Sequence, residues 1–70
     1  MSDVLLPTLL EARCDAEFTQ KDLAIASGVK QGTISEIERG KRNPRDLTKA
    51  KLAKALDRKA DQIDWGGFDR

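Results

Sequence analysis

Four polar side chains that are able to hydrogen-bond the edges of nucleic-acid bases lie within seven residues of one another: Lys30, Gln31, Thr33 and Glu36. The amide of Gln31 can donate to and accept from adenine, and Thr33 offers a hydroxyl and a methyl group to thymine. Lys30 can reach guanine or a phosphate. Glu36 can accept from cytosine, or it can only repel phosphate. Each residue alone is equally compatible with a solvated helix face, whereas the set on one helix predicts base readout.

The stretch 20–38 predicts the two helices that would position these side chains. Leu23, Ala24 and Ile25 form the expected apolar face of the first helix, 20–27. Ile34 and Ile37, three residues apart, form the apolar stripe of the second, 30–39.

The connection between these helices is short and contains Gly28, which permits the left-handed backbone that ends a helix. Two helices joined in this way indicate a helix-turn-helix, in which the start of the second helix contacts bases in the major groove. Gly32 lies inside that helix and weakens it by up to about 1 kcal/mol relative to alanine. It also offers no side chain to a base.

The residues of this region resemble those of the lambda repressor/Cro (XRE-type) family of DNA-binding domains. The positions that carry the resemblance are Gln20, Ala24, Gly28, Val29, Ile34 and Ile37, followed by Glu38-Arg39-Gly40-Lys41, Asn43-Pro44 and Leu52-Ala53-Lys54-Ala55-Leu56. The resemblance covers about residues 9–65. It implies an all-α fold: a compact five-helix lambda-repressor-like domain whose helices 2 and 3 are the helix-turn-helix.

The resemblance also implies roles for three residues outside the readout set. Gln20, at the start of helix 2, would contact a DNA phosphate and buttress Gln31. Arg13 and Glu38 stand at positions where many members have a partly buried arginine–glutamate pair that braces helix 3. The alternative for Arg13 is a surface side chain without a fixed partner, which would contribute little to stability.

A second cluster of polar and basic residues follows helix 3 directly and comprises Lys41, Arg42, Asn43 and Arg45. A charged loop is usually only solvated, but at this place we expect it to clamp the DNA backbone. Such contacts position a protein on DNA without reading its sequence.

The distribution of charge supports this expectation better than the net charge of +1 does. Residues 1–28 carry two basic and five acidic side chains, and residues 60–70 carry one basic and three acidic side chains. Residues 29–59 carry ten basic and four acidic side chains. The basic middle between acidic ends predicts a polarised surface suited to a phosphate backbone.

The remaining helices are predicted from apolar spacing and caps. The first would begin at Leu6 or Pro7 with Ser2 or Asp3 as its cap, and it would run to about residue 16. Thr19 and Asp22 form a capping-box pattern for the second. The fourth would span 47–56 with Asp46 as its cap, and a last short helix would span 59–63. The apolar face of the fourth would be Leu47, Ala50, Ala53 and Leu56. We expect one domain over 1–70, with a core of about 6–65 and a tail at 66–70.

Composition excludes several functional classes. The chain has no histidine and one cysteine, so a Cys/His zinc site and a histidine-based catalytic triad are excluded. A bundle of 70 residues has little room for a catalytic pocket, and we expect neither enzymatic activity nor a cofactor. No secretion signal or membrane-length apolar run is visible, which predicts a cytoplasmic protein without membrane contact.

The apolar residues Ile63, Trp65 and Phe68 in the acidic C-terminal segment either close the core or form a dimerisation patch, and dimerisation is slightly favoured. Together these features predict a sequence-specific regulator of transcription that acts as a homodimer, with repression as the default. Its partner would be the major groove of double-stranded DNA. The alternative is an antitoxin-type protein, which binds a partner toxin through its C-terminal tail and regulates its own gene through the same helix-turn-helix.

Overall fold

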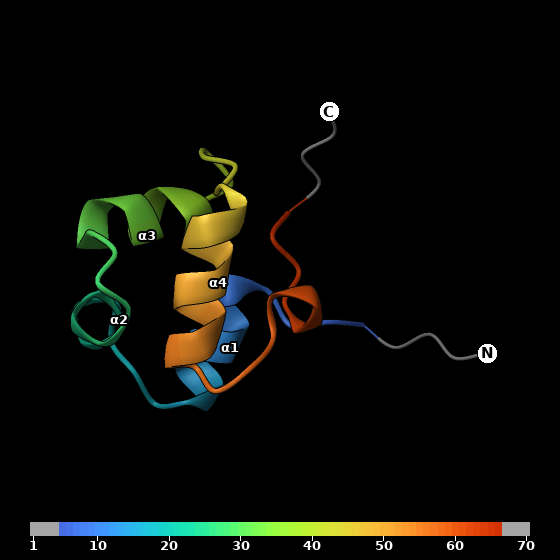
Figure 1. Ribbon diagram of the computed structural model, residues 1–70, viewed down its shortest axis with the longest axis horizontal. Helices are drawn as coiled ribbons and strands as arrows, with labels where there is room; N and C mark the ends of the chain where they lie inside the picture. The colour runs from blue at the N-terminus through green and yellow to red at the C-terminus, as the bar shows by residue number, and fades with distance from the viewer. Residues whose placement is uncertain (1–4, 67–70) are drawn as a thin grey trace.

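The computed structural model describes residues 5–66, which fold into four α-helices followed by one 3-10 turn. The elements are α1 (Leu9–Asp15), α2 (Gln20–Ser27), α3 (Gln31–Glu38), α4 (Asp46–Ala55) and η1 (Ala60–Gln62). Figure 1 shows α4 crossing in front of α1, with α2 and α3 joined at a corner on the opposite side from η1.

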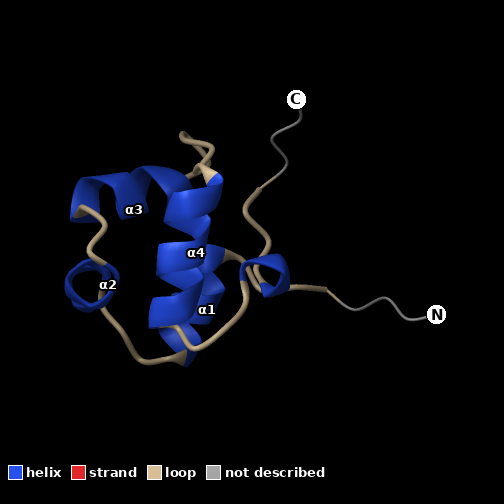
Figure 2. Ribbon diagram, viewed as in Figure 1, coloured by secondary structure: helices blue, strands red, loops and turns tan. Residues whose placement is uncertain are grey.

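The all-α prediction is confirmed, since the described residues contain no strand beyond an isolated bridge between Thr8 and Asp64 (Figure 2). The predicted fifth helix is only the 3-10 turn η1. Gln62 accepts a hydrogen bond from the Lys59 N–H, which closes the turn within three residues. The chain then becomes extended at Ile63, whose side chain enters the core.

The core consists of nine buried apolar side chains contributed by all four helices and the segment after η1. Leu23, Ile34 and Leu52, one each from α2, α3 and α4, are fully buried. The other members are Leu9, Ala12, Ile37, Ala53, Leu56 and Ile63. Because α2 packs against both α3 and α4, the buried residues of these helices hold the helix-turn-helix corner in place.

The predicted start of α1 was wrong. Thr8 is the N-cap: its hydroxyl accepts the Glu11 N–H, and the Glu11 carboxylate accepts the Thr8 N–H. This complete capping box satisfies two N–H groups at once and therefore fixes the start at Leu9. The caps predicted earlier, Ser2 and Asp3, lie outside the described residues.

Parts of the predicted apolar faces were also wrong. On α2, Leu23 is buried and Ala24 packs against the core, but Ile25 is 73% exposed, because consecutive helix residues are turned about 100° from one another. On α4, Ala53 and Leu56 are buried together with Leu52, whereas Leu47 and Ala50 are exposed. The predicted stripe on α4 was thus right in its C-terminal half and wrong in its N-terminal half.

The helix ends near the corner largely agree with the predictions. The bounds of α2 and its capping box from Thr19 to Asp22 are confirmed, and the N–H of Thr19 lowers the pKa of the Asp22 carboxyl by hydrogen bonding to it. The bounds of α3 differ from the prediction by one residue at each end. Asp46 was wrongly predicted as the cap of α4: Arg45 is the N-cap, and Asp46 lies in the first turn, where its charge favours the helix dipole.

Each of the four helices is followed by a residue in the left-handed conformation. Gly28 follows α2 and Gly40 follows α3, at φ of 76° and 75°. After α1 and α4 the same conformation is adopted by Glu17 and Asp57, at φ of 63° and 59°. A side chain in this region is unfavourable, and backbone hydrogen bonds close both turns, from the Phe18 N–H to the Arg13 carbonyl and from the Arg58 N–H to the Ala53 carbonyl.

Candidate nucleic-acid interface

The helix α3 lies along one edge of the fold (Figure 1). Its polar residues are exposed or half-buried. Ile34 and Ile37 pack into the core and anchor the helix there, and these two residues are only 0% and 5% exposed. Lys30, the N-cap, and Gln31, the first helical residue, are exposed, while Thr33 and Glu36 are half-buried. The four predicted readout residues therefore occur together on or beside the exposed part of one helix.

The corner before α3 is rigid for a local reason. The Gly28 N–H donates to the Ala24 carbonyl at 2.9 Å, and the Val29 N–H donates to the Ser27 hydroxyl at 3.1 Å. Val29 packs against the core. Two successive backbone N–H groups of the turn are thus paired, and the start of α3 is held relative to α2.

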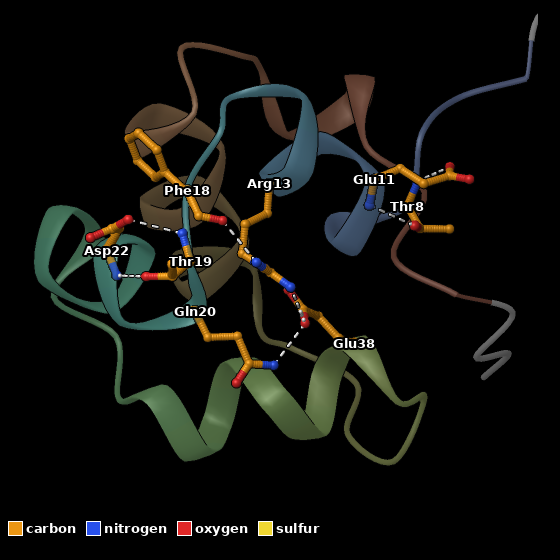
Figure 3. A network of polar contacts seen from close by, with 8 residues as sticks. All are labelled: Thr8, Glu11, Arg13, Phe18, Thr19, Gln20, Asp22 and Glu38. Carbon is orange, nitrogen blue, oxygen red and sulfur yellow. Dashed lines mark hydrogen bonds and ion pairs between the residues drawn. The ribbon is translucent and has the colours of Figure 1, made fainter.

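A polar brace joins the C-terminal end of α3 to α1 and α2 (Figure 3). The Glu38 carboxylate accepts from Arg13 Nε at 2.6 Å and Nη2 at 3.3 Å, and from Gln20 Nε2 at 2.9 Å. Arg13 Nη1 also donates to the Phe18 carbonyl at 2.8 Å. The side chains of Arg13 and Glu38 are 13% and 5% exposed. The hydrogen bond that Arg13 donates to Glu38 raises the pKa of Arg13 despite its burial.

The side chain of Gln20 is held in place by a hydrogen bond to Glu38. Its amide N–H is donated to Glu38, and among residues 5–66 no hydrogen bond joins it to Gln31. An amide has two N–H donors, so Gln20 retains a second N–H while Glu38 fixes its orientation. The brace therefore connects the stability of the fold to the side chain at the start of α2.

The loop after α3 places its basic residues next to the end of that helix. Lys41, Arg42, Asn43 and Arg45 are all exposed, and the buried Pro44 anchors the loop from within. The Lys41 N–H donates to the Glu36 carbonyl at 2.8 Å, which wraps the chain back over the last turn.

The same turn brings Arg42 Nε to 2.7 Å from Glu36 Oε1, with side chains 52% and 42% exposed. This ion pair between a readout candidate and a clamp candidate was missed from the sequence. A glycine turn directly after a helix, with opposite charges six residues apart, is the signal by which it could have been found.

The three C-terminal dimerisation candidates lie in different environments. Ile63 is buried in the core at 3% exposed. Trp65 is half-buried against the core, and its indole N–H donates to the Ala60 carbonyl at 2.8 Å. Phe68 lies outside the described residues.

Comparison with known proteins agrees with this geometry. A family model described as helix-turn-helix matches residues 9–63. The chain belongs to the Cro/C1-type (XRE) helix-turn-helix family. Neither the search of curated proteins nor the search of solved structures found a match. A helix-turn-helix domain of this family is a DNA-binding regulatory domain, and α3 is the second helix of the helix-turn-helix.

Two further findings concern other kinds of site. Within residues 5–66, His, Cys, Asp and Glu side chains do not gather into a group able to hold a metal ion. No helix in the same range is both long and apolar enough to cross a membrane.

Gly32 in the recognition helix provides a stability test. It has open space where a Cβ would stand and an ordinary helical backbone, whereas Gly40 has a φ of +75°. We expect Gly32→Ala to raise the free energy of unfolding by about 0.5–1 kcal/mol, because alanine favours the helix. Gly40→Ala should lower it by about 1 kcal/mol, because its backbone is left-handed. Urea unfolding followed by circular dichroism measures the free energy of unfolding of both variants. If both substitutions change it with the same sign, the helical backbone at Gly32 or the left-handed backbone at Gly40 is wrong.

Proposed function

We propose that this protein is a sequence-specific transcriptional repressor that acts in the cytoplasm as a homodimer on a two-fold symmetric operator. The observation that carries the proposal is the braced recognition helix: α3 is held from the inside by two buried isoleucines and at its end by Glu38, while Gln31 remains exposed. A rigid element that presents a bidentate hydrogen-bonding side chain suits the major groove.

The exposed basic loop supports the same proposal through its electrostatics. Lys41, Arg42 and Arg45 follow the C-terminal end of α3, and Gln20 is the first residue of α2. Two backbone clamps on either side of a recognition helix fix its register on the duplex, while Lys30, Gln31 and Thr33 select the sequence. No catalytic role is proposed.

Homodimerisation follows from the size of the readout surface. One helix of eight residues contacts only a few base pairs, and a second copy one duplex turn away, roughly 34 Å, doubles the length of DNA read. An operator of this kind overlapping a promoter would exclude the polymerase, which makes repression the expected outcome.

The proposal is tested by selecting bound sequences from a random duplex pool and then measuring affinity by fluorescence anisotropy between 50 and about 300 mM salt. We expect a two-fold symmetric consensus and a logarithmic salt slope of about −0.9 for each phosphate neutralised. Absence of an enriched sequence, or affinity that does not change with salt, would refute the proposal. A stable complex with a small partner protein that releases the DNA would instead favour the antitoxin hypothesis.

The Glu36–Arg42 ion pair leads to a further prediction about DNA affinity. In the free protein Arg42 is held by Glu36, so a phosphate must compete with a carboxylate for it. We expect Glu36→Gln to tighten binding to all sequences by about 3- to 10-fold and to steepen the salt slope by about one phosphate. The measurement is anisotropy on the selected operator and on a scrambled duplex.

The control for this prediction is Asp46→Asn, which removes one exposed carboxylate from the start of α4. If Glu36 accepts from cytosine, Glu36→Gln will weaken operator binding and leave the scrambled duplex unchanged. That result would contradict the competition and assign Glu36 to base readout.

A further inference from the structure

A wide cavity lies away from the recognition helix, between the C-terminal half of α4 and η1. It has a volume of about 520 Å³, within the range of about 300–1,000 Å³ that is typical of ligand sites. Among residues 5–66, none of those proposed to contact DNA lines this cavity; its lining comes from residues 50–62. We call it the α4–η1 groove.

The apolar part of the α4–η1 groove consists of three alanines. Ala50 and Ala53 belong to α4, and Ala60 begins η1. Ala53 is 1% exposed, Ala60 is half-buried and Ala50 is exposed, so the methyl groups extend from the core to the surface. A depression lined by methyl groups takes up an aliphatic side chain, because both apolar surfaces then leave water.

The charged part of the groove is cationic. Lys54 and Lys59 are exposed, and Arg58 is half-buried. Asp57 is the one acidic residue among the lining residues that the structure describes. Three positive charges against one negative charge leave an excess of two positive charges at the groove, in a chain whose net charge is only +1. This excess attracts carboxylates to the groove.

Hydrogen bonds hold the groove in shape without using its cations strongly. The N–H of Arg58 donates to the Ala53 carbonyl at 2.8 Å and closes the turn after α4. The indole N–H of Trp65 donates to the Ala60 carbonyl at 2.8 Å and ties η1 to the segment that follows it. The Arg58 side chain pairs with the exposed Asp15 at 3.6 Å. That contact is weak, so a better-placed carboxylate can replace it.

We propose that the α4–η1 groove binds an acidic peptide segment of another protein. An aliphatic side chain of the peptide packs against the three alanines, and carboxylates on either side of it pair with Lys54, Arg58 and Lys59. The ligand is thus complementary to the groove in charge and in apolar surface. The binding goes beyond the proposed function, because it requires no DNA.

The make-up of the groove favours a peptide over other anionic ligands. A DNA backbone has phosphates but no aliphatic group to cover the alanines. Small-molecule sites are typically lined by aromatic side chains with a few precisely placed polar groups, whereas no described lining residue is aromatic and the two lysines are flexible and exposed. A second copy of this chain brings the same positive excess at its own groove, which opposes a groove-to-groove contact.

The place of the groove allows the partner and DNA to be bound together. Figure 1 shows the C-terminal end of α4, in orange, at the opposite end of that helix from α3. A peptide in the groove therefore leaves the exposed side of α3 open to the major groove. On the operator, the groove would hold a second protein beside the promoter, and this consequence alone rests on the proposed function.

The first test selects peptides from a random library displayed on phage, with the full chain as the immobilised target. We expect enriched peptides to carry acidic residues on both sides of an aliphatic residue, and their affinity to fall as salt is added. Absence of enrichment, or enrichment of basic or uncharged peptides, would overturn the proposal. Inorganic phosphate is the second probe: if it displaces the enriched peptide as effectively as the unlabelled peptide does, the groove is only an anion site and the proposal fails.

Variants of the groove decide where the enriched peptide binds, with affinity measured by fluorescence anisotropy. Lys54→Glu/Lys59→Glu should weaken binding at least tenfold. The matched control, Lys21→Glu/Lys51→Glu, reverses two exposed lysines outside the groove and should change the affinity less than threefold. Asp57→Asn should tighten binding about threefold, because it removes a carboxylate from the groove, and asparagine tolerates the left-handed backbone there. Equal effects of the two double variants, or no gain from Asp57→Asn, would overturn the proposal.

Two further measurements separate this inference from the proposed function. Amide chemical shifts of the wild type should change on addition of the peptide at residues 50–62, and changes confined to α3 or to residues 5–10 would overturn the proposal. Affinity for the selected operator should change less than twofold when the peptide is bound, and release of the DNA would place the peptide on the DNA-binding surface and overturn the proposal. If the wild type binds the peptide but selects no operator, the function fails and the inference stands; if it selects an operator but enriches no acidic peptide, the inference fails and the function stands.

Discussion

Arg13→Ala is expected to lower the free energy of unfolding by about 3 kcal/mol, because it leaves the carboxylate of Glu38 almost buried without its charged partner. A domain of this size has a total stability on the order of 5 kcal/mol, so the variant should be partly unfolded near physiological temperature. The expected fall in melting temperature is about 12–24 °C. Differential scanning calorimetry and urea unfolding measure the effect.

The matched control is Arg58→Ala, which removes an arginine that pairs with the exposed Asp15 at 3.6 Å. An exposed pair of this kind contributes less than about 1 kcal/mol. The double variant Arg13→Met/Glu38→Gln should recover much of the loss, because it removes both charges together. If Arg13→Ala and Arg58→Ala have equal effects, the brace from α1 to α3 does not stabilise the fold in the way proposed.

Glu38 also holds Gln20 through a hydrogen bond, so the brace has a consequence for DNA binding. A variant of the brace that remains folded at low temperature should bind DNA more weakly, because Gln20 and the end of α3 are no longer held together. Stability and function are therefore linked through one carboxylate in this fold.

Gln31→Ala is expected to weaken binding to the selected operator by about 2 kcal/mol, roughly 30-fold, while leaving binding to a scrambled duplex almost unchanged. The physical reason is that the amide of Gln31 contributes to discrimination only where the correct base offers a donor and an acceptor together. The measurement is anisotropy on both duplexes at one salt concentration, and on operators substituted at each position.

Arg42→Ala serves as the comparison, because a phosphate contact carries no sequence information. It should weaken both duplexes alike and reduce the salt slope by about one phosphate. If Gln31→Ala instead lowers affinity for both duplexes equally, Gln31 contacts the DNA backbone and a different residue of α3 reads the sequence.

The sequence by itself determined the helix-turn-helix. Its signals are local: the Thr19–Asp22 capping box, the left-handed turn at Gly28 and the isoleucines three residues apart each depend on neighbours within one helical turn. For the same reason the bounds of α2 and α3 were predicted to within one residue.

The faces of α1 and α4 required the tertiary structure. Both helices have more apolar residues than they bury, so periodicity alone cannot select the stripe; the packing of α4 on α2 and η1 selects Leu52 over Leu47. Leu5 and Leu6 also stay exposed, because the capping box at Thr8 starts α1 after them and they cannot join its inner face.

The polar contacts also fall into two kinds, those determined by chain neighbours and those determined by the tertiary structure. The pairing of Arg13 with Glu38 was implied only by a family resemblance, since 25 residues separate them in the chain. The pairing of Arg42 with Glu36 was not foreseen at all. Caps and turns are determined by chain neighbours, whereas the partner of an ion pair depends on where two helices and a loop meet in space. In this protein, local sequence therefore determines that a recognition helix forms, and only the tertiary structure decides which of its polar side chains are held by the fold and which remain available to DNA.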